Sequence, residues 1–238
     1  MFPPTDNPAQ RLLELLREAR TKGNGPISKM WASVFGIEDM DAPTCYRILG
    51  HLNNLVDSVE IRIKQIEGIN HELYLRDLPT IRQIICPDGI TTNWNNIKQP
   101  LDTGVLTGLE FCANELSKSH NEEDVSEEDL NRIKKEFSTV FDEVSKADID
   151  PNLKLVLYDL LTSALISIEQ YKILGNDGLK KSIAYTLGVL TLHKDEFLSA
   201  KEKGIVKKTM SAIKSLCDVV ALACRVKELQ ASVQNLLQ

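Results

Sequence analysis

The chain has few aromatic residues, only 5% of its 238 positions, and this scarcity disfavours sites that depend on several stacked rings. Aromatic cages and base-stacking platforms both need rings close together. The chain also lacks a large excess of either charge, because its net charge of −6 is shared evenly by the two halves. Neither half is basic enough to neutralise a phosphate backbone, so the composition argues against nucleic-acid binding.

Motifs built on cysteine are absent as well. The five cysteines form no C-x-x-C pair and none has metal-ligand spacing from a histidine, so we expect reduced thiols and no metal.

No apolar run approaches the roughly 20 residues that a membrane span needs. The opening MFPPTDNP lacks the basic and apolar parts of a signal peptide. We therefore expect a soluble, cytoplasmic protein with no cofactor and no membrane partner.

Helical periodicity is present in almost every segment. The strongest pattern of the first half lies at residues 41–68, where apolar residues recur at spacings of three and four. Asn7 and Asp150 are good helix caps, and each is followed by proline. The Pro, Gly, Asn and Thr residues at 86–100 predict a loop. No segment has a convincing strand pattern, so the predicted fold class is all-α, a multi-helix bundle.

The second half is predicted to end in a long helix at residues 205–237, on the order of 48 Å at 1.5 Å per residue. Two adjacent apolar rows on this helix indicate packing between two neighbours or at a subunit interface. Further helices are expected at 71–85 with a break at Pro79, at 101–116, from Asp150 to Gly175, and at 178–193.

An acidic segment separates the two halves. Six acidic residues fall between Glu122 and Asp129, and Ser126 with Asp129 resembles a capping box at the start of the next helix. The predicted organisation is an N-terminal helical subdomain at 1–118, an acidic linker at 119–128 and a C-terminal helical bundle at 129–238.

One pair of residues, Arg47 and His51, resembles the motif of HEPN ribonucleases. In that motif four to six residues separate an arginine from a histidine, and the first of them is usually polar. Here only three intervene, and the first is Ile48. At 100° per residue the pair shares a polar flank of its helix with Asn54 and Arg62. Two interpretations stay open: the edge of a packing surface, and a divergent ribonuclease site.

Two other features are candidates for binding. Trp94 lies in the polar loop ITTNWNN, where it would either anchor a partner or pin the loop to the core. Lysines including Lys207 and Lys208 give the start of the last helix a local positive charge. This charge indicates either a solvated helix face or a surface that docks an acidic partner.

Complete catalytic motifs are missing. The sequence contains no phosphate-binding glycine loop, no G-x-S-x-G motif and no E-x-x-H pair typical of di-iron bundles. His71 and Glu72 begin like the zinc-protease helix, but Leu75 stands where that motif has its second histidine. We therefore lean towards a protein that is not an enzyme.

The stretches NPAQRLLELLREAR…MWASVFGI and DIDPNLKLVLYDLLTSALISIEQYKILGNDGLKKSIAYTLG resemble a group of bacterial helical proteins without an established activity. The resemblance covers about a third of the chain and implies a bacterial origin. Some proteins of this kind lie in mobile or phage-defence gene neighbourhoods. The shared residues Trp31, Phe35, Asp150, Pro151 and Gly175 are interpreted as structural.

The leading functional hypothesis is a non-enzymatic helical interaction or regulatory protein that binds a protein partner or another copy of itself. Its more specific form is an accessory component of a bacterial phage-defence or stress system. The alternative is a HEPN-like ribonuclease that uses Arg47 and His51. A third option is a small-molecule sensor with a pocket between helices.

Overall fold

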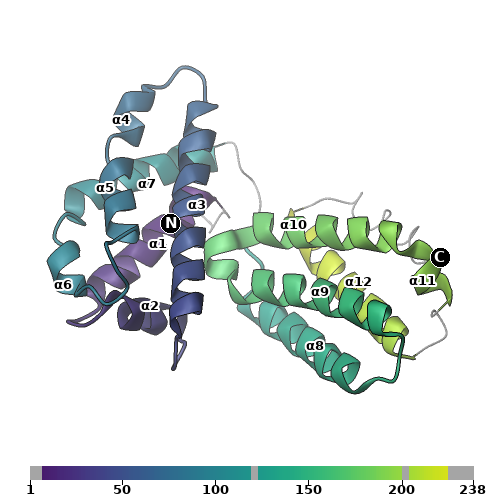
Figure 1. Cartoon of the computed structure of the whole chain (residues 1–238). Coiled ribbons are helices and arrows are strands. Elements are labelled where there is room, and N and C mark those ends of the chain that lie inside the picture. The colour runs from purple at the N-terminus through teal and green to yellow at the C-terminus, as the bar shows by residue number, and fades with distance from the viewer. Residues whose placement is uncertain (1–6, 119–122, 200–203, 225–238) are drawn as a thin grey trace. The chain divides into compact units, whose positions relative to one another are not determined.

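The structure, a computed structural model, describes residues 7–118, 123–199 and 204–224. These residues form helices joined by loops and include no β-strand, which confirms the predicted all-α fold. One isolated β-bridge joins Pro26 and Asn93. The chain divides into two compact units, Pro3–Asn121 and Glu122–Gln238, here named unit one and unit two. Figure 1 labels the helices of both units.

Unit one is built around two long helices that pack against α1. The helix α1 contacts α7 and α3, while α2 and α5 also pack on α3. The helices of this unit are α1 (Pro8–Thr21), α2 (Ile27–Phe35), α3 (Ala42–Lys64), α4 (His71–Leu75), α5 (Leu78–Ile85), α6 (Trp94–Ile97) and α7 (Thr103–Ser117).

The predicted cap Asn7 also ties the start of α1 to α7. Its Oδ1 accepts a hydrogen bond from the backbone N–H of Gln10 at 2.9 Å, as a helix cap does. Its Nδ2 donates to the carbonyl oxygen of Ala113 at 3.4 Å and to Ser117 Oγ at 3.0 Å. Because Asn7 is fully buried, these bonds satisfy an amide that would otherwise destabilise the unit.

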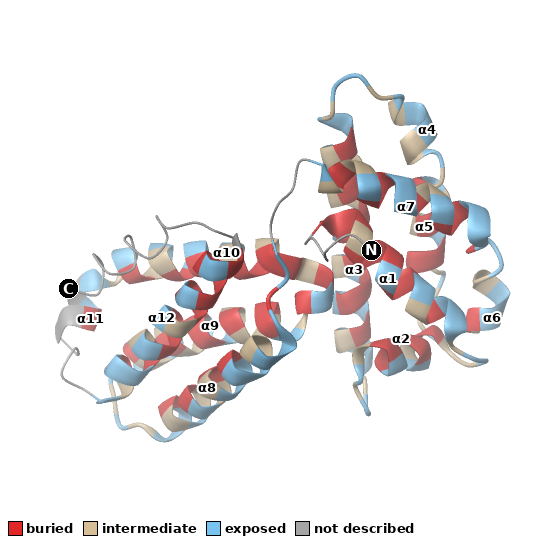
Figure 2. Cartoon of the chain, turned by 180° about the vertical axis from the view of Figure 1, so that it is seen from behind, coloured by how far each residue is buried: buried red, intermediate tan, exposed pale blue. Residues whose placement is uncertain are grey.

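Unit two is a bundle of four long helices with one short helix. The helix α9 packs between α8 and α10, and α12 contacts α8 and α10 in turn. Figure 2 shows buried residues along the facing sides of these helices. The helices are α8 (Glu127–Lys146), α9 (Pro151–Glu169), α10 (Tyr171–Leu192), α11 (Lys194–Ser199) and α12 (Gly204–Cys224).

The predicted caps of unit two are present. Ser126 Oγ accepts from the Asp129 backbone N–H at 3.1 Å and donates to the Asp129 carboxylate at 2.8 Å. Asp150 Oδ1 accepts from the backbone N–H groups of Asn152 and Leu153, and Pro151 occupies the first turn of α9. These contacts satisfy N–H groups that have no partner inside the helix.

A buried polar network holds the segment before α8 against the start of α10. The Val125 backbone N–H donates to the Tyr171 hydroxyl at 2.8 Å, and that hydroxyl donates to Asn176 Oδ1 at 2.9 Å. Asn176 Nδ2 donates to the Glu123 carbonyl at 2.9 Å. Thus residues 123 and 125, which were predicted as linker, are bonded to unit two, and Glu127 already belongs to α8.

Two predicted helix boundaries lie elsewhere. The helix that was expected to stop at Gly175 ends at Glu169, and a new turn starts at Tyr171. Gly175 then has φ 57° and ψ −158° inside α10, a conformation that only glycine adopts readily. The break near Pro79 falls between α4 and α5, and Pro79 sits in the first turn of α5, where a missing N–H costs little. Residues 225–237 of the predicted last helix lie outside the described residues.

Among the described helices, α9 alone is long and apolar enough to cross a membrane by length and composition. Its buried side chains, including Leu157, Leu160 and Leu161, belong to the core of unit two. A helix in the core of a bundle can be equally long and apolar, so the length and composition of α9 do not place it in a membrane.

Candidate functional site

The pair Arg47 and His51 lies on α3, as the sequence indicates. Arg47 is exposed, and its Nη2 donates to Thr44 Oγ1 in the same helix at 3.2 Å. His51 is half-buried one turn further on. Of the two other polar residues predicted for this flank, Asn54 is exposed and Arg62 is half-buried. The ribonuclease hypothesis remains a prediction that this geometry does not test.

Trp94 does not have the exposure that a partner-binding residue needs, so its selection as a candidate binding residue is corrected. Its side chain is fully buried, and its indole N–H donates to the carbonyl oxygen of Ala19 at 3.0 Å. Its ring lies 6.5 Å from that of Trp31, and its backbone N–H bonds to the carbonyl of Gly25. Trp94 therefore pins its loop to the core of unit one.

The lysines at the start of the last helix lie on α12. Lys207 and Lys208 are exposed. Lys208 Nζ pairs with the Glu143 carboxylate of α8 at 2.7 Å, so part of this positive charge is already paired within unit two. This ion pair is exposed and contributes little to stability.

The described cysteines and acids do not form a metal site. Among these residues no cluster of three His, Cys, Asp or Glu side chains is arranged to hold a metal ion. Burial, helped by the nearby carboxylates of Asp77 and Asp218, raises the pKa of the Cys112 and Cys217 thiols to about 12. Neither thiol is a ready nucleophile at neutral pH, because the thiolate is the reactive form.

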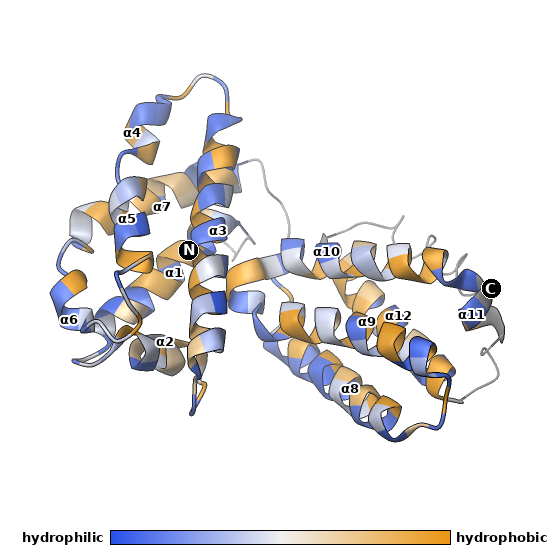
Figure 3. Ribbon diagram, viewed as in Figure 1, coloured by the Kyte–Doolittle hydropathy of each residue, from blue (hydrophilic) through white to orange (hydrophobic). Residues whose placement is uncertain are grey.

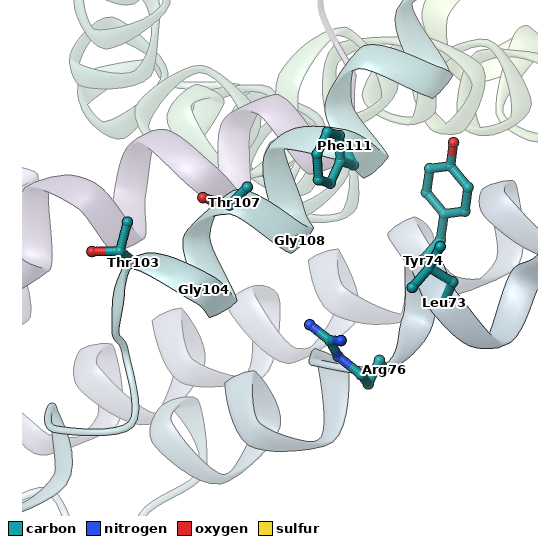
Figure 4. Close-up of a pocket in the computed structure, with 8 residues that line it drawn as sticks. All are labelled: Leu73, Tyr74, Arg76, Thr103, Gly104, Thr107, Gly108 and Phe111. Carbon is teal, nitrogen blue, oxygen red and sulfur yellow. The ribbon is translucent and has the colours of Figure 1, made fainter.

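The feature of unit one best suited to binding is a groove between α4 and α7 that the sequence did not reveal. Its volume is about 540 Å³. Figure 4 shows α7 along one side, with Leu73 and Tyr74 of α4 and the following Arg76 on the other. We name it the α4–α7 groove. Its lining residues are Leu73, Tyr74, Arg76, Thr103, Gly104, Thr107, Gly108 and Phe111.

Several contacts fix α4 against α7 at one end of this groove. The Tyr74 hydroxyl donates to Glu115 Oε2 at 3.2 Å, and the Cys112 thiol donates to the Tyr74 carbonyl at 3.2 Å. The Asp77 carboxylate approaches Gly108 so closely that an added Cβ would lie 2.4 Å from Oδ2. The absence of a side chain at Gly108 therefore lets the chain after α4 approach the backbone of α7.

The rim of the groove exposes two large apolar side chains. Leu73 is 59% exposed and Phe111 is 60% exposed. The Arg76 guanidinium extends towards the glycines of α7, and its Nε donates to Asp77 Oδ1 at 3.2 Å (Figure 4). The groove thus combines apolar walls, a floor with two glycines and a single cationic side chain.

A second groove of about 550 Å³ lies on the other side of α7, against α1. Thr103 and Thr107 line both grooves. In the second groove Arg17 pairs with Glu110 at 2.8 Å, whereas Arg20 is exposed and makes no ion pair with any residue that the structure describes. Arginine side chains therefore lie on both sides of the exposed ridge of α7.

Sequence reasoning missed this site for a physical reason. α4 has five residues, too few for a periodic pattern to show which side chains it exposes. Leu73 looks like an ordinary core residue in so short a helix. Two signals were available in α7: helical spacing sets Phe111 opposite the buried side of the helix, and it places Gly104 and Gly108 on one face.

Comparisons of the chain with protein-family models, with curated proteins and with solved structures found no match.

Proposed function

We propose that this chain is a non-enzymatic interaction protein and that unit one binds a helical segment of a partner protein in the α4–α7 groove. The observation that carries the proposal is the pair Leu73 and Phe111, both more than half exposed at the rim of one groove. Large apolar side chains grouped around a concave surface are typical of interaction sites.

The floor of the groove favours a helix as the occupant. Gly104 and Gly108 present backbone rather than side chains, which keeps the floor low, although the Asp77 carboxylate already lies against Gly108. An incoming apolar side chain would therefore rest mainly on the apolar walls of the groove. Amphipathic helices bind apolar grooves in this way, with anchoring side chains three, four and seven residues apart. Leu73 and Phe111 would then pack on either side of the anchor.

The charges around the groove favour a partner with acidic residues. Arg76 lies at one edge and pairs with Asp77, but its side chain is still 65% exposed. Arg20 lies on the other side of α7 and has no ion pair among the described residues. An amphipathic helix with aspartate or glutamate beside its apolar anchors would match these arginines, and charge matching of this kind raises association rates and specificity.

The biological setting we propose is an accessory role in a bacterial phage-defence or stress system. Only the resemblance of the sequence to bacterial helical proteins supports this setting. A partner encoded beside this gene would strengthen it if its binding required Phe111.

The test is selection of helical peptides from a displayed library on the full-length protein, followed by measurement of Kd for the selected peptides. We expect the selected peptides to combine large apolar anchors with acidic neighbours. Phe111→Asp should weaken their binding by about tenfold or more, because a charge would be buried against the apolar anchor of the peptide. Tyr46→Asp is the matched control, since Tyr46 is also an aromatic residue of unit one and is 58% exposed.

Two results would contradict the proposal. Selected peptides that bind the Phe111→Asp and wild-type proteins equally would place the binding site elsewhere. An RNA-cleaving activity that disappears in both the Arg47→Ala and the His51→Ala variants would instead support the ribonuclease alternative.

A further inference from the structure

The outer faces of the bundle helices in unit two differ sharply in charge. The exposed surfaces of α8 and α12 carry many charges, among them Lys134, Lys135, Asp142, Lys208 and Lys214. In α10, by contrast, residues 182–192 contain no charged side chain. Figure 3 shows orange and pale residues along the second half of α10 up to the blue start of α11. A helix with apolar residues around its whole circumference is normally buried on every side.

Two matching rows of side chains form the outer surface of α9 and α10, which we name the α9–α10 face. Both rows have the spacing i, i+4, i+7 and i+11, which places their members on one side of each helix. Leu155 is 68% exposed and Leu192 is 83% exposed. The rows are Leu155, Asp159, Thr162 and Ile166 on α9, and Lys181, Tyr185, Gly188 and Leu192 on α10.

One contact fixes the register of the two rows. The Tyr185 hydroxyl bonds to the Asp159 carboxylate, so these residues lie at the same level of two antiparallel helices. Because α10 runs antiparallel to α9, Leu155, one turn before Asp159, lies beside the stretch of α10 between Gly188 and Leu192. Thr162, about one turn after Asp159, lies beside Lys181. The face therefore has an apolar end, at Leu155 and Leu192, and a polar end, at Thr162 and Lys181.

We propose that the α9–α10 face binds the same face of a second copy of the chain. The two hairpins would form an antiparallel four-helix bundle with the two-fold axis along the helices, so that α9 of each copy packs against α10 of the other. Leu155 would then lie against Gly188 and Leu192 of the second copy. No atom lies within 4 Å of a Cβ placed at Gly188, so this glycine leaves space for the incoming leucine.

Charge complementarity identifies the occupant as a second copy. The face carries one anion, Asp159, and one cation, Lys181, and Lys181 makes no ion pair with a described residue. In the proposed arrangement Asp159 of each copy lies within about one helical turn of Lys181 of the other. A membrane surface fits less well, because a helix that lies on anionic lipid has lysine or arginine along its rim, whereas α9 exposes Asp159 and Glu169.

Charge reversal tests this arrangement directly on the full-length chain. Asp159→Lys and Lys181→Asp should each weaken self-association by about tenfold or more, because like charges then face each other across the interface. The two variants mixed together should form a heterodimer at wild-type strength, since each copy supplies the charge that the other needs. Analytical ultracentrifugation over a concentration series measures all four cases.

Two further variants keep the test independent of folding. Leu192→Glu changes a residue that is 83% exposed, so it should leave the helical circular dichroism unchanged while it weakens the dimer. Asp142→Lys on the exposed surface of α8 is the matched control and should leave the dimer intact. A wild-type chain that stays monomeric at every concentration would overturn the proposal. So would charge-reversed variants that fail to associate when mixed, or a dimer that Leu192→Glu leaves unchanged.

Discussion

At the scale of single residues, burial decides which of the chemically active side chains are available. Cys112 and Cys217 are each 1% exposed and Cys45 is fully buried, whereas Cys86 is exposed. Burial raises the pKa of all three buried thiols. Reactivity should therefore follow exposure and not the positions of the cysteines along the sequence.

Thiol labelling and pH-dependent unfolding check this account. At pH 8, in a Cys224→Ala background, we expect rapid labelling of Cys86 alone. The pKa of Cys112 and Cys217 rises from 9.0 to about 12 on folding, which favours the neutral thiol. The stability that this shift contributes is full below pH 9 and is lost as the pH rises towards 12.

Replacement of Cys112 by alanine should remove the part of the alkaline loss of stability that comes from this thiol. The free energy of unfolding, measured from pH 8 to 11 by denaturant titration, should therefore fall less steeply in Cys112→Ala than in the parent. If the free energy of unfolding fell equally steeply with pH in the two proteins, the buried Cys112 thiol would not be the cause of the alkaline destabilisation.

Trp94 shows where sequence alone leaves two alternatives open at a single residue. In a polar loop the tryptophan would either anchor a partner or pin the loop to the core, and its full burial bears out the second alternative. The decisive contacts come from distant parts of the chain: the Ala19 carbonyl in α1 and the Trp31 ring in α2. Long-range contacts of this kind leave no local pattern in the sequence.

At the scale of elements, local chemistry specified the helices well. The caps Asn7, Ser126 and Asp150 start helices as predicted, because each side chain bonds to backbone N–H groups within its own first turn. The end of α9 was misplaced because a glycine is a common helix terminator. Here the chain breaks earlier, and Gly175 serves the sharp turn that brings Tyr171 and Asn176 together.

The Tyr171 network should be an important contributor to the stability of unit two. Tyr171→Phe leaves the Val125 N–H and Asn176 Oδ1 without their buried partner, so we expect a loss of about 2–3 kcal/mol in the free energy of unfolding. Denaturant titration followed by circular dichroism measures the loss. Amide exchange at Val125 should quicken at the same time.

Tyr158→Phe provides the control for that experiment. Tyr158 is half-buried and packs edge-on to Phe141, with no hydrogen bond from its hydroxyl among the described contacts. It should change stability by less than about 0.5 kcal/mol. If the two substitutions lowered the free energy of unfolding equally, the buried hydrogen bonds of the Tyr171 hydroxyl would not stabilise unit two.

At the scale of the whole molecule, the two units offer surfaces of different kinds. Unit one has a concave apolar groove with arginines nearby, and unit two has the α9–α10 face with its two matching rows. The sequence predicted two helical halves and an interaction role, and its candidate binding residues lie outside both of these surfaces. Helical spacing sets Phe111, Leu155 and Leu192 opposite the buried rows of their helices, so their exposure could be predicted locally. Leu73 lies in a helix too short for such a pattern, and the pairing of α4 with α7 or of α9 with α10 depends on the fold.

Hydrogen–deuterium exchange of the full-length protein, with and without a selected acidic amphipathic peptide, tests the central claim most directly. Binding in the α4–α7 groove predicts slower exchange at the amides of α4 and of Thr103–Phe111 in α7. Slower exchange confined to the part of α3 that contains Arg47 and His51, or to α9 and α10, would contradict it.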